Sequence, residues 1–151
     1  MRVSGGFVRI LPIRYEMNTL TGSEMSAEDV VEFLRLMEEN GIDVHLDGGW
    51  GVDALLGLQT RSHEDLDIAV QHKDVPALRG LLEARGYREF QSPDAKDFNF
   101  VLSDSQGRKI DVHSYTFDPQ GSHVYGIAYP ISSLTGTGMI NGHPVKCISA
   151  E

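Results

Sequence analysis

Residues 63–68 read His-Glu-Asp-Leu-Asp-Ile, and this stretch sets the interpretation of the whole chain. Acidic and apolar residues alternate across it, which predicts a strand over residues 66–70 with the apolar side chains on its buried face. Asp65 and Asp67 then leave the opposite face together. Two neighbouring carboxylates repel each other unless a cation lies between them, so the pair predicts a divalent metal site. The alternative is a solvated edge strand, because so short a motif has many false positives.

The residues upstream favour the metal interpretation. A short strand is predicted over residues 42–46, followed by Gly48-Gly49 and by a short helix over residues 50–56. A strand, a glycine pair and a helix start together form a place where phosphate groups can approach bare backbone amides. Gly48 and Gly49 are therefore candidate nucleotide-binding residues.

A third carboxylate, Asp111, lies downstream in a strand predicted over residues 109–115. On this strand Ile110 and Val112 face the core of the domain, and Asp111 and His113 face the other way. Asp111 is the candidate third metal ligand and the candidate base for an attacking hydroxyl. His113 is a second candidate base and a candidate pocket residue, with a hydrogen-bonded surface histidine as the alternative.

Four residues near the glycine and acidic pairs receive further assignments. Arg61 and His63 are candidate nucleotide-binding residues, since a positive Arg61 can meet a phosphate tail. The alternative for Arg61 is a surface ion pair with an acidic neighbour. Asp53 is assigned a structural role as a partner of Arg61. Trp50 is assigned to the core or to the wall of a substrate pocket.

The remaining pattern predicts a mixed α+β domain. A helix begins after the cap Ser26, carries one buried apolar stripe and ends at Asn40-Gly41. Another helix is predicted over residues 75–85. Further strands are predicted over residues 87–90, 99–103 and 109–115, with weaker ones near 123–128, 139–140 and 145–148. Turns are predicted at residues 105–107 and at Asn141-Gly142.

Composition sets the remaining bounds. The 151 residues suffice for one domain, and we predict a tail over residues 1–25 and a domain over residues 26–151. No apolar run approaches the ~20 residues of a membrane helix and no signal peptide is recognised, so a cytoplasmic protein without membrane contact is expected. The single cysteine, Cys147, excludes an internal disulfide. A formal net charge of −9 argues against nucleic acid as a partner and suits a cationic small molecule.

Two segments together resemble a known family. Residues 46–57 read Leu-Asp-Gly-Gly-Trp-Gly-Val-Asp-Ala-Leu-Leu-Gly, and residues 60–68 read Thr-Arg-Ser-His-Glu-Asp-Leu-Asp-Ile. They resemble the antibiotic nucleotidyltransferases, namely the lincosamide nucleotidyltransferases and the aminoglycoside 2''-adenylyltransferases. The likeness runs from the first predicted helix to Cys147-Ile148-Ser149 and so covers most of the chain.

The resemblance implies a polymerase-β-like nucleotidyltransferase fold, a small mixed sheet flanked by helices. It also implies Mg²⁺, ATP or another nucleoside triphosphate as donor, and transfer of AMP to a hydroxyl of a small molecule such as a lincosamide or an aminoglycoside. On this basis Gly48 and Gly49 bind the triphosphate, Asp65 and Asp67 hold the metals, and Asp111 is the later acidic position and the base.

One departure from the family leaves the acceptor open. Relatives continue past the position of Ser149 into a helical segment that helps form the acceptor pocket or the subunit contact. We therefore expect an intact nucleotide-binding half with a shortened C-terminus, and a homodimer by analogy. Two other functions stay open: a nucleotidyltransferase acting on a protein, of the toxin–antitoxin type, and a non-catalytic nucleotide-binding remnant. The complete set of Asp65, Asp67 and Asp111 argues against the remnant.

Overall fold

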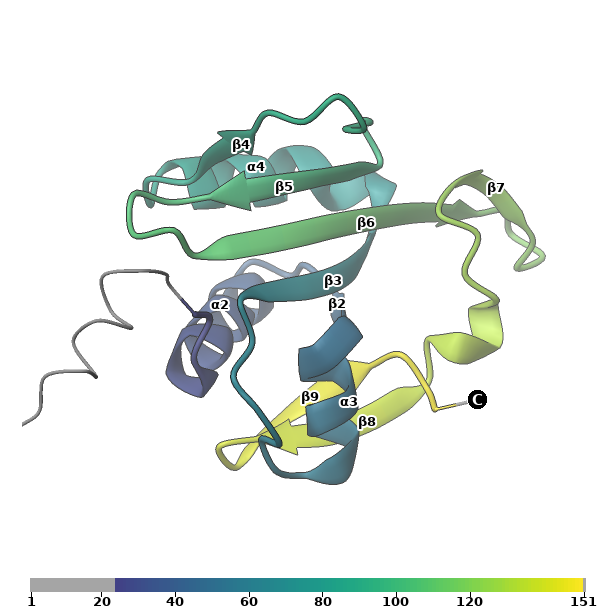
Figure 1. Ribbon diagram of the computed structural model, residues 1–151. Coiled ribbons are helices and arrows are strands. Elements are labelled where there is room, and N and C mark those ends of the chain that lie inside the picture. The colour runs from purple at the N-terminus through teal and green to yellow at the C-terminus, as the bar shows by residue number, and fades with distance from the viewer. Residues whose placement is uncertain (1–23, 151) are drawn as a thin grey trace, which may run out of the picture.

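The computed structural model describes residues 24–150 (Figure 1). Residues 1–23 of the predicted tail lie outside the described residues. Met25, which we assigned to that tail, is buried in the core, and its backbone N–H donates to the carbonyl of His63 at 2.9 Å. The folded domain therefore includes Met25.

A single mixed sheet forms the centre of the described part of the chain. Its order is β4-β5-β6-β3-β2-β9-β8, and β7 pairs with β6 outside that path. The strands are β2 (Val44–Asp47), β3 (Asp65–Gln71), β4 (Arg88–Phe90), β5 (Asn99–Ser103), β6 (Lys109–Phe117), β7 (His123–Gly126), β8 (Gly136–Ile140) and β9 (His143–Cys147). The β3–β6 and β2–β9 pairs are parallel and the other pairs are antiparallel. The predicted small mixed sheet is confirmed.

Between residues 24 and 150, three α-helices accompany this sheet: α2 (Ala27–Glu39), α3 (Gly48–Leu56) and α4 (Val75–Glu83). Two short 3₁₀ helices, η2 (His72–Asp74) and η3 (Ile131–Ser133), complete the described elements. Figure 1 shows α2 and α4 behind the sheet and α3 in front of β8 and β9. Ser26 caps α2 as predicted: its side chain accepts the Asp29 N–H, and the Asp29 carboxylate accepts the Ser26 N–H.

Two predicted boundaries on either side of Asp47 were wrong. The strand predicted over residues 42–46 begins later, because the Ile42 N–H still donates back to the Met37 carbonyl at the end of α2. The helix predicted from residue 50 begins at Gly48, because the side chain of Asp47 accepts the Gly48 N–H and caps it.

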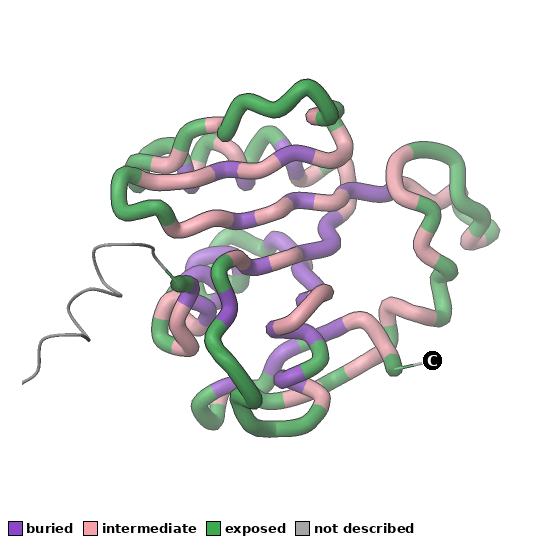
Figure 2. The backbone as a smooth tube through the Cα atoms, in the orientation of Figure 1, coloured by how far each residue is buried: buried purple, intermediate pink, exposed green. Residues whose placement is uncertain are grey.

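Apolar side chains of the central strands form the core that fixes the sheet. Figure 2 shows buried residues recurring along β3 and β6, where they alternate with partly exposed ones. On one face of these two strands the fully buried residues are Leu66, Ile68, Val70, Ile110 and Val112. The opposite face carries the partly exposed Asp65, Asp67 and Asp111. Between residues 24 and 150, every helix is too short or too polar to cross a membrane.

Candidate active site

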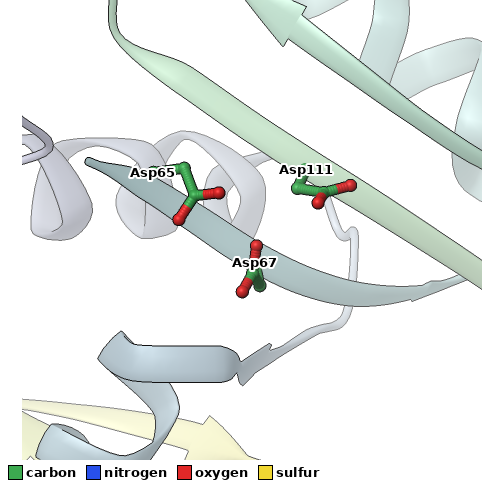
Figure 3. Close-up of side chains that lie close together, drawn as sticks. All are labelled: Asp65, Asp67 and Asp111. Atoms are coloured by element: carbon green, nitrogen blue, oxygen red, sulfur yellow. The ribbon is translucent and has the colours of Figure 1, made fainter. Parts of the chain in front are cut away.

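Three aspartates meet on the face of the sheet opposite the buried strand residues (Figure 3). β3 and β6 pair in parallel with Asp67 directly opposite Asp111, and Asp65 lies on the same face of β3. One carboxylate oxygen from each of the three lies within 4.8 Å of the others. The structure thus brings together the three residues predicted as metal ligands.

The surroundings of these carboxylates disfavour negative charge. Burial, and after it the charges of Asp65 and Asp111, raises the pKa of Asp67 to about 6. Burial also raises the pKa of Asp111, although His113 acts in the opposite direction. His113 Nε2 lies 3.4 Å from Asp111 Oδ1. Within the described residues that buried oxygen has no hydrogen-bond partner, so the acidic face holds charge that its protein neighbours do not balance.

The donor set fits a hard divalent cation. Mg²⁺ takes oxygen ligands, often from one or two carboxylates together with substrate phosphates. A cation among Asp65, Asp67 and Asp111 would relieve their mutual repulsion and would give the Asp111 oxygen a partner. The residues present therefore fit a magnesium site.

The glycine turn lies against this acidic face. Gly48 has a φ of +60°, in the left-handed region that favours glycine, and a Cβ at this position would overlap the carboxylate of Asp67. A Cβ on Gly49 would come within 2.5 Å of His63 Nδ1 and 2.9 Å of Arg61 Nη2. Both glycines are therefore required by close approach, and the start of α3 lies against the aspartates.

Arg61 and His63, predicted to bind nucleotide, lie in different environments. Arg61 is exposed, and its guanidinium donates to the Ser62 carbonyl at 3.1 Å. His63 is only 3% exposed, and its Nε2 donates to Asp53 Oδ2 at 2.6 Å. The ring therefore lies beneath the glycine turn, and the assignment of His63 to nucleotide binding stays a prediction.

Asp53 has the predicted structural role but not the predicted partner. It is 2% exposed and holds His63 and Thr60, whose N–H and hydroxyl both donate to it, instead of Arg61. Burial raises the pKa of Asp53, but the hydrogen bonds from Thr60 and His63 outweigh that effect, and the pKa lies below its usual value. The carboxylate thereby fastens the loop before β3 to α3.

The two predicted pocket residues separate. Trp50 is 2% exposed, its indole N–H donates to the Met25 carbonyl at 3.0 Å, and its ring packs 4.7 Å from that of His63. The start of α3 turns the ring into the core, which is the first of the two places predicted for Trp50, and its assignment to a substrate pocket stays a prediction. His113 shares the face of Asp111 as predicted and is partly exposed.

Sequence reasoning gave no role to two residues that touch the site. Asp47 lies opposite Asp67 in the β2–β3 pairing, and its position at a strand end before glycine is a signal for a helix cap. The hydroxyl of Tyr129 donates to Asp47 Oδ2 at 2.9 Å. Tyr129 lies in an irregular segment far along the chain, and no local pattern pointed to it.

Comparison with known proteins places these features in one family. A model of the aminoglycoside-2''-adenylyltransferase family matches residues 29–151. The 2''-aminoglycoside nucleotidyltransferase of Escherichia coli is 25% identical over 120 residues, which cover 80% of this chain and 66% of that protein. A lincosamide resistance protein of Staphylococcus haemolyticus is 33% identical over 69 residues, 46% of this chain and 43% of that protein. The chain thus spans just under two thirds of the length of the E. coli relative.

Solved structures share the fold. The lincosamide antibiotic adenylyltransferase LnuA in its lincomycin-bound form gives a TM-score of 0.71 at 23% identity, covering 84% of this chain and 82% of that chain. ANT(2'')-Ia in complex with adenylyl-2''-tobramycin gives 0.64 at 24% identity, covering 82% and 68%. The predicted nucleotidyltransferase fold is confirmed.

Proposed function

Because the chain belongs to the aminoglycoside-2''-adenylyltransferase family, we propose that it transfers AMP from ATP, with Mg²⁺, to a hydroxyl of an antibiotic. The observation that carries this proposal is the meeting of Asp65, Asp67 and Asp111 beside the glycine turn. A phosphoryl-transfer site needs both parts, since one balances the charge of the phosphates and the other receives them.

Each part of the site has a role in the proposed reaction. Asp65, Asp67 and Asp111 hold the metal, which when bound polarises the phosphate and offsets its charge. The glycine turn at Gly48 and Gly49, with the start of α3 behind it, receives the triphosphate, and the exposed guanidinium of Arg61 offers it a positive charge. His63 supports the turn from beneath.

The proposed chemistry is an in-line displacement at the α-phosphorus. A bond forms between the acceptor oxygen and that phosphorus, the bond to the bridging oxygen breaks, and pyrophosphate leaves. Asp111 takes the proton of the acceptor hydroxyl. His113, 3.4 Å from Asp111, is the alternative base.

The acceptor class follows from the relatives and from charge. The matched proteins are named for aminoglycosides and lincosamides, and a net charge of −9 attracts cationic molecules of this kind. A cytoplasmic location and a homodimer are part of the same proposal, and light scattering after size exclusion tests the dimer.

The test is direct transfer of label. The purified protein is incubated with α-³²P-ATP, Mg²⁺ and a panel of aminoglycosides and lincosamides, and the products are separated by thin-layer chromatography. We expect a labelled antibiotic together with pyrophosphate, and no product from Asp67→Asn. Absence of transfer to any acceptor, combined with absence of ATP binding by calorimetry, would refute the proposal.

A further inference from the structure

A fourth carboxylate, Asp47, borders the acidic face without joining the group of three. It lies opposite Asp67 on β2, as Asp111 does on β6, so Asp47, Asp67 and Asp111 form one row across three neighbouring strands. Among the described residues, the acidic group close enough to share one cation is Asp65, Asp67 and Asp111. Some contact must keep Asp47 apart from it, since neighbouring carboxylates compete for the same cation.

Hydrogen bonds engage both oxygens of Asp47. Oδ1 accepts the N–H of Gly48 at 2.9 Å, and Oδ2 accepts the hydroxyl of Tyr129 at 2.9 Å. Hydrogen bonds to an ionised acceptor are stronger than neutral ones and more specific in geometry. The side chain of Asp47 is therefore committed to the glycine turn on one side and to Tyr129 on the other.

Tyr129 is itself held in place. It lies in the connection between β7 and β8, which is fastened at one end by the Ile127 N–H on the Ser114 carbonyl at 2.8 Å. At the other end His45 Nε2 lies 3.1 Å from the Leu134 carbonyl. The Tyr129 ring packs edge-on against Tyr115 at 5.8 Å, and Tyr115 is 3% exposed.

The charges around Tyr129 keep its hydroxyl a donor. Burial, and after it the charge of Asp47 and its hydrogen bond, raises the pKa of Tyr129 well above its usual value. Asp67 and Asp111 act in the same direction, so the hydroxyl lies within electrostatic reach of the acidic face.

The glycine turn needs such a restraint. Gly48 has positive φ and touches the Asp67 carboxylate, so a small change of the turn would alter both the amides and a metal ligand. Glycine has more accessible conformations than any other residue, and a neighbour that fixes it removes that freedom before a ligand arrives.

We propose that Tyr129 and Asp47 are positioning residues of the nucleotide site, in which the Tyr129 hydroxyl fixes the Asp47 carboxylate and the carboxylate fixes the Gly48 turn. This inference rests on the proposed nucleotidyltransferase function and adds residues to its site. It assigns the connection between β7 and β8 a part in binding the triphosphate.

The experiment compares Tyr129→Phe with Tyr125→Phe. Both variants remove a tyrosine hydroxyl that donates to an aspartate, but Tyr125 pairs with Asp97, away from the acidic face. Binding of α,β-methylene-ATP with Mg²⁺ is measured by calorimetry, and binding of Mn²⁺ alone by electron paramagnetic resonance. We expect Tyr129→Phe to weaken nucleotide binding about tenfold, as for a lost hydrogen bond to a charged group. Mn²⁺ affinity should stay within about twofold, and Tyr125→Phe should match the wild type in both assays.

A second pair of variants tests Asp47. Asn caps a helix as well as Asp does and keeps polar atoms toward Gly48 and Tyr129, whereas Ala keeps neither contact. Asp47→Asn should therefore bind the nucleotide analogue about fivefold tighter than Asp47→Ala, a difference of the size of one cap.

The outcomes separate this inference from the proposed function. Equal nucleotide affinity in Tyr129→Phe and Tyr125→Phe overturns the positioning role, and so does an equal loss of Mn²⁺ binding in Tyr129→Phe, which indicates general damage to the acidic face. A wild-type protein that binds neither probe refutes the proposed function itself.

Discussion

Replacing Asp67 by Asn should stabilise the metal-free protein. In the folded state the pKa of Asp67 is raised from 3.8 to about 6, first by burial and then by Asp65 and Asp111. At pH 7.5 the ionised side chain therefore destabilises the fold by at most about 3 kcal/mol. Solvent at this partly exposed site reduces that to about 1 to 2 kcal/mol. The neutral amide removes this term, and the midpoint of thermal unfolding should rise by about 4 to 8 °C.

The direction of the pH dependence follows from the same pKa. A group whose folded pKa is raised stabilises the fold only while it is protonated, and this stability is lost as pH rises through about 6. The advantage of Asp67→Asn should therefore be full at pH 7.5 and should shrink as the pH falls from 6 toward 4.

Thermal melts followed by circular dichroism in EDTA, and then with Mg²⁺, provide the assay. Mg²⁺ at about 100 times its dissociation constant should stabilise the wild type by about 2.7 kcal/mol, and the variant by much less, so the order of stabilities reverses. Asp94→Asn, an exposed carboxylate outside the site, should behave as the wild type in both buffers. If Asp67→Asn in EDTA at pH 7.5 melts at or below the wild-type midpoint, the repulsion argument is wrong.

Three further outcomes are expected. Mn²⁺ affinity should fall about tenfold between pH 7.5 and pH 5, because only about one Asp67 in ten is ionised at pH 5 when its pKa is about 6. Electron paramagnetic resonance of free Mn²⁺ measures this affinity. An affinity that does not change with pH would contradict the prediction. Gly48→Ala should destabilise the protein by about 3 kcal/mol in urea unfolding, since it combines positive φ with overlap on Asp67. Gly41→Ala, at φ +71° with open space around it, should destabilise the protein by about 1 kcal/mol. Equal losses would show that the overlap at Gly48 is relieved. Asp53→Ala should destabilise the protein by about 3 kcal/mol at pH 7.5, because it leaves buried His63 without its partner. Since the pKa of Asp53 is lowered, this difference should shrink as the pH falls and wild-type Asp53 becomes protonated. A loss independent of pH would assign the effect to packing alone.

Much of the fold followed from local patterns in the sequence. The capping box at Ser26 and Asp29 located α2, and alternation within β3 and within β6 placed Asp65, Asp67 and Asp111 opposite the core side of their strands. The turn at Asn141-Gly142 formed as predicted, with φ positive at both residues. These features depend on contacts between close neighbours in sequence, which is why residue spacing alone predicted them.

What the sequence did not predict depends on contacts between distant segments. β8 is longer than predicted, because the prediction stopped at its glycines, which are weak strand formers. In the structure these glycines allow close packing, since a Cβ on Gly138 would overlap the Ala54 carbonyl of α3. His63 is buried beneath the start of α3, and Trp50 is buried because α3 turns its ring into the core. Periodicity alone does not predict burial that depends on how a helix packs. The bond between Tyr129 and Asp47 has no local signature either.

The parallel pairing of β3 with β6 also bears on the order of folding. In the sequence, α4, β4 and β5 come between β3 and β6, so Asp67 meets Asp111 only after this long segment has closed into a loop. The β5–β6 hairpin, in contrast, can form from neighbouring residues. Asp111 is thus far from Asp65 and Asp67 in the unfolded chain, although the three carboxylates meet in the native state. Divalent cations should accordingly slow unfolding while leaving the refolding rate nearly unchanged, and stopped-flow refolding with and without Mg²⁺ would show whether the site assembles after the rate-limiting step.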